Sequence, residues 1–285
     1  MAKNSLKIML LLLFSIFYVI NGDAQNLHRK FQDLPCINKN YNVVVHVAVD
    51  SINREPIWTE FEVDSIIAET SKYFEPICMT YSLCEYNVMK EDYSLGYLKD
   101  VPIEIEDRYS ELDAKFAKKH KINIFLLDTI ETKRCGDGYF FGIMSQDSAV
   151  IFTERDCADG QAEQIAHLFG HMFGLRNTYH PIEIELVDGS NCADVADKIC
   201  DTPADPFMQT YINPDDLELI NQGESIKSSF TSDCEFVYEL KDPNGEYYQP
   251  DVGNIMSAYP CKCGFTREQY LFIVESYYKV DPKHF

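Results

Sequence analysis

Two histidines stand four residues apart in the segment His167-Leu-Phe-Gly-His171. On a helix this spacing places both imidazoles on one face, one turn apart, where they can bind a single metal ion such as zinc. The same spacing also occurs in pairs of buried, hydrogen-bonded helix histidines, so it does not decide between the two interpretations. The residue after the first histidine is Leu168, which cannot take a proton from a metal-bound water. If the pair does bind a metal ion, the site therefore has no general base at the next residue.

The segments that must position this pair follow the order of a layered α/β protein. Apolar runs predict buried strands, and apolar residues at helical spacing predict helices. We expect strands over residues 41–49, 77–88, 122–128 and 149–153, and helices over residues 62–74, 107–120, 161–173 and 266–280. The helix 161–173 carries both histidines and should end at Gly174. Beyond His180 the periodicity fades, so we predict an irregular part that disulfides hold together.

The first residues have the pattern of a secretory signal peptide. Lys3 and Lys7 precede an apolar run from Ile8 to Ile20, and small and polar residues follow it. Thirteen apolar residues are short for a membrane span, and no later run is longer. We therefore predict a signal peptide over residues 1–24, an exposed lead-in over residues 25–40 and a mature protein that is secreted or periplasmic and outside the membrane.

The negative charge of the chain argues against two classes of binding partner. Its formal net charge is −21, which repels nucleic acid and anionic membranes. Such a surface keeps a protein soluble, and it can also group carboxylates around calcium.

The chain has ten cysteines, an even number that favours disulfides in an exported protein. We predict the pairs Cys78–Cys84 and Cys135–Cys157 from their spacing. Cys36 is expected to pair with another cysteine rather than act as a switch. Cys261 and Cys263, which are separated by one residue, are expected to take different partners.

Four motifs in order resemble the pappalysin-type metzincins, the group of secreted metallopeptidases related to ulilysin. The first is the histidine helix with its following Gly174 and Leu175. The others lie at Cys192–Pro203, which resembles the family's Asp-Thr-Pro block, at Asn254–Ser257, which resembles the Met-turn, and at Cys263–Thr266, which opens the last helix. The resemblance implies a metzincin-like zincin fold over residues 41–285. We expect a cleft between subdomains at about 41–177 and 178–285, with the histidine helix along its floor.

The same resemblance implies that the catalytic parts are replaced. Active members have a Glu where this chain has Leu168 and a third zinc-binding His where it has Asn177. They also have an oxyanion-stabilising Tyr where this chain has Ala258, with Tyr259 one residue further on. Met256 of the Met-turn is retained. Because ligand, base and oxyanion donor are lost together, the resemblance predicts an inactive homologue.

Two other residues could replace the missing zinc ligand and the missing base, and one loop could bind a calcium ion. His180 as a third ligand and Glu163 as a base would give the alternative interpretation, an active zinc metalloendopeptidase with a rearranged site. The family resemblance also suggests structural calcium in an oxygen-rich loop, with the candidate ligands Asp188, Asp194, Asp197, Asp201 and Thr202.

We therefore predict a secreted metallopeptidase homologue without peptidase activity, which binds zinc weakly if at all and holds a peptide or protein in its cleft. The strand at 149–153 is the candidate edge for such a peptide. The remaining alternative is a structural domain with neither metal nor occupied cleft. The sequence leaves the natural ligand and the oligomeric state open.

Overall fold

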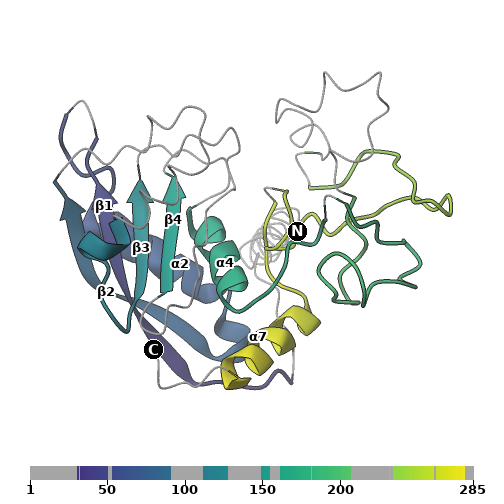
Figure 1. The fold of residues 1–285 in the computed structure, drawn as a ribbon, viewed down its shortest axis with the longest axis horizontal. Coiled ribbons are helices and arrows are strands. Elements are labelled where there is room, and N and C mark those ends of the chain that lie inside the picture. The colour runs from purple at the N-terminus through teal and green to yellow at the C-terminus, as the bar shows by residue number, and fades with distance from the viewer. Residues whose placement is uncertain are drawn as a thin grey trace, which may run out of the picture.

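Figure 1 shows a computed structural model of the chain. It describes residues 31, 33–50, 53–90, 112–127, 149–154, 161–180, 182–206, 231, 234–259 and 261–279. The predicted signal peptide and the predicted Cys135–Cys157 disulfide lie outside these residues.

Four parallel strands form one sheet in the order β2-β1-β3-β4 (Figure 1). They are β1 (Lys39–Ala48), β2 (Met79–Met89), β3 (Ile122–Leu127) and β4 (Ala149–Glu154). Parallel neighbours need long connections, which agrees with the wide spacing of these strands in the chain. Each strand lies where the sequence predicted one. Within the described residues β2 and β4 are the edges of the sheet.

Both faces of β1 are covered. Val43, Val45 and Val47 face the main core, whereas His46 stacks on Phe125 of β3 on the other face, with 4.6 Å between the ring centroids. Phe116 lies 6.1 Å from the same His46 ring, in a helical segment over residues 112–116. Because neither face meets water, the strand is a continuous apolar run rather than an alternating one.

The predicted helix over residues 107–120 ends earlier than expected, at residue 116. The reason is Asn123, whose side chain binds the backbone of Lys118. Its Oδ1 accepts from the Lys118 N–H at 2.8 Å, and its Nδ2 donates to the Lys118 carbonyl at 2.9 Å. These bonds hold the turn before β3 outside a helix.

The helix α2 (Glu60–Lys72) begins at a capping box. Thr59 accepts from the Glu62 N–H at 3.3 Å, and the Glu62 carboxylate accepts from the Thr59 N–H at 2.7 Å. The box satisfies backbone donors that the first turn leaves unpaired, so the helix starts two residues before the predicted position.

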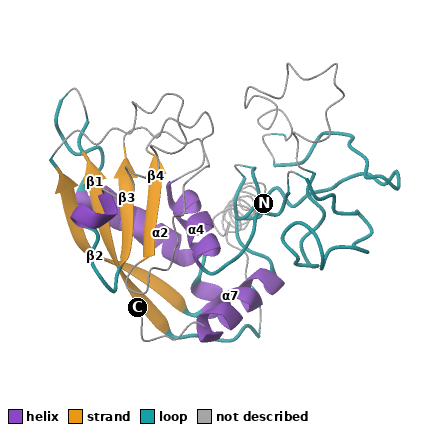
Figure 2. Ribbon diagram, in the orientation of Figure 1, coloured by secondary structure: helices purple, strands orange, loops and turns teal. Residues whose placement is uncertain are grey.

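The core lies between the sheet and three helices, α2, α4 (Gln161–Met172) and α7 (Arg267–Lys279). Aromatic rings join them: Tyr81 of β2 stacks on Phe169 of α4 at 4.2 Å, and Phe74 lies 5.3 Å from Phe265. Figure 2 shows these helices beside the strands, with the loop-rich part of the chain beyond α4 and α7.

The Cys78–Cys84 disulfide predicted from spacing is wrong. Cys78 pairs with Cys36, while Cys84 is free and exposed. Cys78 directly precedes β2 and Cys84 lies within it, so an extended backbone holds the two about 20 Å apart, beyond the reach of a disulfide. Cys84 is the extra residue of a bulge, since Val43 pairs with Leu83 and the next residue of β1 pairs with Glu85.

The described residues between Met172 and Arg267 contain no helix and no strand longer than an isolated bridge. Two disulfides, Cys192–Cys200 and Cys234–Cys261, hold this part together, as expected from its composition. Cys261 pairs with Cys234 but Cys263 is free, so the expectation that both have disulfide partners is wrong for Cys263. Within the described residues, we find no helix with the length and apolarity needed to cross a membrane.

Candidate functional site

The helix α4 brings the two predicted histidines together. His167 is 8% exposed and His171 is half-buried, and their rings lie edge to face with centroids 4.6 Å apart. The helix ends at Met172, and Gly174, two residues further on, has a φ of +92°, a conformation that favours glycine. Local helix geometry therefore suffices to place this pair, as the four-residue spacing predicted.

Each imidazole is oriented by a backbone carbonyl. Nδ1 of His167 lies 2.7 Å from the carbonyl oxygen of Ile255, and Nδ1 of His171 lies 2.8 Å from that of Leu175. A carbonyl only accepts, so Nδ1 carries the proton in both rings and each Nε2 keeps its lone pair. This tautomer is the one in which a histidine can bind a metal or accept a hydrogen bond.

The surroundings keep both rings neutral. Burial lowers the pKa of His167 well below its usual range, and the nearby ammonium of Lys262 lowers it further. Burial also lowers the pKa of His171, and Lys262 again adds to the effect. At neutral pH the site is therefore a pair of uncharged imidazoles with a lysine close by.

Leu168 and Asn177 are the residues that the resemblance aligns with the general base and the third zinc ligand. Leu168 is fully buried and belongs to the hydrophobic core. The Asn177 amide lies close enough to His171 to raise the pKa of that ring against the effect of burial, although its buried Oδ1 makes no hydrogen bond of normal geometry within the described residues. Neither residue supplies a base or an imidazole nitrogen.

The proposed substitutes do not join the site. Nδ1 of His180 accepts from the backbone N–H of Glu183 at 3.0 Å and of Ile182 at 3.3 Å, so this ring caps the following turn. Glu163 accepts a hydrogen bond from the hydroxyl of Tyr73 at 2.9 Å, at the contact between α4 and the end of α2. The described residues contain no group of three or more His, Cys, Asp or Glu that could hold a metal ion.

Tyr259 does not replace the missing tyrosine either. It is 1% exposed, and its hydroxyl donates to Asp205 at 3.0 Å. The other oxygen of the same carboxylate accepts from the hydroxyl of Thr178, just after the histidine helix. Tyr259 therefore ties the Met-turn to the interior, and Ala258 carries no group that could stabilise an oxyanion.

The Met-turn packs directly against α4. Met256 is fully buried, and its carbonyl accepts from the Thr178 N–H at 3.1 Å. Its sulfur would lie only 2.5 Å from a Cβ placed on Gly170, and the Phe265 ring would lie 3.2 Å from that Cβ. The absence of a side chain at Gly170 therefore allows the close approach of the two segments.

We expect Gly170→Ala to destabilise the protein although alanine favours helices. The substitution gains about 1 kcal/mol of helix propensity, but the new methyl group collides with Met256, for which overpacking costs about 1–3 kcal/mol. Urea unfolding of Gly170→Ala and of the double variant Gly170→Ala/Met256→Ala measures this. Gly170→Ala should cost less stability when it is added to Met256→Ala than when it is added to the wild-type protein, because the sulfur is then absent. A Gly170→Ala protein more stable than wild type would contradict the packing.

Lys262 is the residue of this site that the sequence reasoning missed. Its ammonium donates to the Ile255 carbonyl at 3.1 Å and to the Ser257 carbonyl at 2.9 Å. The Ile255 oxygen is also the acceptor for His167. No sequence signal identifies Lys262, because only folding brings residue 262 back over the Met-turn.

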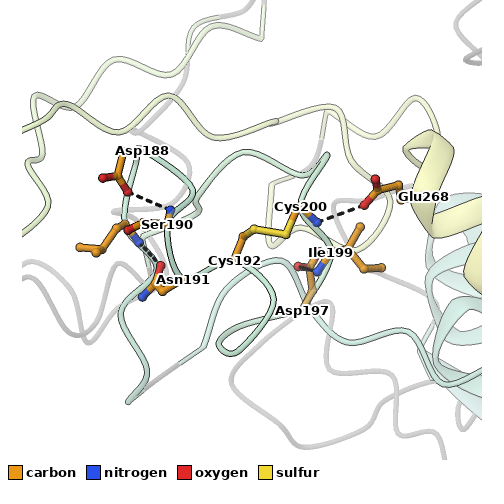
Figure 3. The surroundings of a disulfide bond; sticks show 9 residues. Asp188, Ser190, Asn191, Cys192, Asp197, Ile199, Cys200 and Glu268 are labelled. Atoms are coloured by element: carbon orange, nitrogen blue, oxygen red, sulfur yellow. Dashed lines mark hydrogen bonds between the residues drawn. A yellow bond between two sulfur atoms is a disulfide. The ribbon is translucent and has the colours of Figure 1, made fainter.

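The five predicted calcium ligands do not meet at one point. Asp188 is exposed and accepts from the Ser190 N–H at 2.9 Å (Figure 3). Asp194 is exposed as well. Asp201 accepts from Thr266 and from the Glu268 N–H, at 2.6 and 2.8 Å, so it caps α7. Calcium in this loop stays a prediction from the sequence.

Asp197 and Thr202, the other two candidates, are buried. Oδ1 of Asp197 accepts from the Ile199 N–H at 3.0 Å beside the Cys192–Cys200 disulfide, as Figure 3 shows. Oδ2 of Asp197 and Oγ1 of Thr202 are buried without a hydrogen-bond partner within the described residues. The preceding Ala196 has a φ of +48°, a left-handed conformation that favours glycine.

The loop-rich part instead buries three carboxyl groups in electrostatic reach of one another. Burial, helped by the charges of Asp197 and Asp205, raises the pKa of Glu185 to about 8. Burial likewise raises the pKa of Asp205 to about 7 and that of Asp197 to about 6. Glu185 is 4% exposed, and its Oε2 has no hydrogen-bond partner within the described chain.

A catalytic zinc ion does not fit the residues present. Two imidazole nitrogens are available, but the third position offers an amide, and the base position offers a core leucine. An amide oxygen is a poor zinc ligand beside imidazole, and a catalytic site also needs a group to activate the water.

Comparison with known proteins gives little further information about the function of this site. No family model and no curated protein matches the chain. Among solved structures, the chain is similar to metalloproteinase-II from Bacteroides fragilis, with a TM-score of 0.30 and 13% sequence identity. The match covers 53% of this chain and 46% of that protein, less than half its length. The function therefore has to be inferred from the geometry of the site.

Proposed function

We propose that this protein is an exported metzincin homologue of the pappalysin type that no longer hydrolyses peptides and instead binds an extended peptide or protein segment. The observation that carries the proposal is the pair of residues around the histidines. Leu168, in place of the base, lies in the core, and Asn177, in place of the third ligand, lies beside His171. Hydrolysis needs both groups, so their loss removes the reaction while the helix and the Met-turn packing persist.

Peptide binding needs only a strand edge and not a metal. β4 is an edge of the described sheet and runs parallel to β3. An added strand would pair with its backbone groups, and neighbouring side chains would select the sequence. Export is supported by the three disulfides, since disulfides persist in oxidising compartments.

The hydrolysis part of the proposal is tested with the oxidised protein, an unstructured peptide library and added zinc. We expect no more cleavage, measured by mass spectrometry, than with the His167→Ala variant. Cleavage by the wild-type protein that a chelator and His167→Ala both abolish would instead establish the rearranged zinc endopeptidase.

The binding part is tested by hydrogen exchange with the same library. We expect peptides to protect the backbone amides of β4, whereas those of β2, at the other edge, serve as the control and exchange as before. If no peptide protects β4 more than β2, the protein is a structural domain and the binding part of the proposal is wrong.

A further inference from the structure

Lys262 occupies an unusual place for a charged side chain. Its ammonium lies at the junction of the histidine helix and the Met-turn, where the Ile255 carbonyl accepts from both His167 and Lys262. It also reaches the Ser257 carbonyl at 2.9 Å. One cation therefore holds carbonyl groups on both sides of Met256.

The backbone on either side fixes the position of this lysine. Cys261 is tied to Cys234 by a disulfide. On the other side the Cys263 N–H donates to the Gly253 carbonyl at 2.8 Å, and the Ile255 N–H donates to the Gly264 carbonyl at 2.9 Å. A long flexible side chain between two such anchors loses less conformational freedom when its ammonium binds. The contact is therefore a built feature of the fold and not a chance approach of a surface lysine.

The charge of Lys262 also acts on the histidine pair. Its ammonium shares the Ile255 carbonyl with Nδ1 of His167, so a positive charge lies next to that ring. A divalent cation at the Nε2 atoms of the histidine pair would be repelled by this charge.

We infer that Lys262 is the resident cation of this site: it holds the Met-turn to the histidine helix and opposes metal binding at His167 and His171. It is a positioning residue, since it acts through the Ile255 and Ser257 carbonyls. This inference rests on the proposed loss of the metal centre.

The test measures zinc affinity in a protein given a third imidazole. Asn177→His is compared with Asn177→His/Lys262→Gln and Asn177→His/Lys262→Arg by competition with a chromophoric chelator. Removing the charge should tighten zinc binding at least about tenfold, which corresponds to about 1.4 kcal/mol. The Arg variant, which keeps the charge, should stay within about threefold of the lysine protein. Equal affinities of the Gln and Lys proteins, or equal tightening by Gln and Arg, would overturn the inference.

A second measurement applies if the Gln variant does not fold. The inference then expects the near-ultraviolet dichroism of a folded protein for Asn177→His/Lys262→Arg, because the Arg side chain also carries a charge that can hold the Ile255 and Ser257 carbonyls. Loss of folding in the Arg variant as well would overturn the inference. Neither assay uses peptide, so a protein that binds or cleaves peptides would refute the proposed function separately.

Discussion

Leu168→Glu is expected to destabilise the protein by at least about 4 kcal/mol and to restore no peptide cleavage. The side chain is fully buried in the apolar core. The substitution removes a buried leucine, at about 2–5 kcal/mol, and places a carboxylate among the apolar side chains of the core. Such a loss is comparable to the whole stability of many domains. Zinc cannot compensate, since Asn177 still occupies the third position.

Two control variants separate burial from charge. Leu168→Met keeps the volume and apolar character and should cost less than about 1.5 kcal/mol. Phe61→Glu makes an apolar-to-Glu change on α2, at a side chain that is 81% exposed, and should stay within about 0.5 kcal/mol. Urea unfolding with circular dichroism measures all three variants. A Leu168→Glu protein as stable as Phe61→Glu would show that position 168 faces open space and would reopen the question of catalysis.

Glu185→Gln should make the protein increasingly more stable than wild type as the pH rises from 5 to 8. The pKa of Glu185 is raised from 4.5 to about 8 by burial and by neighbouring carboxylates. The folded state therefore binds more protons than the unfolded state across this window. The contribution of Glu185 to stability is present below pH 4.5 and is lost as the pH approaches the folded pKa. Glutamine does not ionise, so the variant avoids this loss.

The measurement is the difference in unfolding free energy between Glu185→Gln and wild type at several pH values. One proton gives a slope of up to about 1.4 kcal/mol per pH unit, and coupling to Asp197 and Asp205 spreads it over a wider range. Burial lowers the pKa values of His46, His167 and His171, so these residues make both proteins more stable as the pH rises. Subtracting the wild-type free energy from that of the variant removes this contribution.

Asp188→Asn is the matched control for this titration, because Asp188 is exposed and its pKa is lowered by the Ser190 N–H. Its difference from wild type should be constant between pH 5 and 8. A difference for Glu185→Gln that is equally flat would mean that Glu185 is solvated in the folded protein.

Much of the sheet and the histidine pair could be predicted from the sequence, because both depend on neighbours in the chain. Continuous apolar runs mark β1 and β3, since a strand buried on both faces needs apolar residues throughout. His167 and His171 share a helix face because the helix repeat brings them there. The chemical identity of Leu168 and Asn177 was equally plain.

Only the tertiary structure decided the contacts between distant segments. It paired Cys78 with Cys36 instead of Cys84, turned His180 toward Glu183, and buried Glu185 beside two aspartates. It also brought Lys262 onto the carbonyl that orients His167. Sequence periodicity records which face of an element is apolar, but not which distant residue will lie against it. That choice depends on how the loops close and how the whole core packs, which are properties of the complete chain.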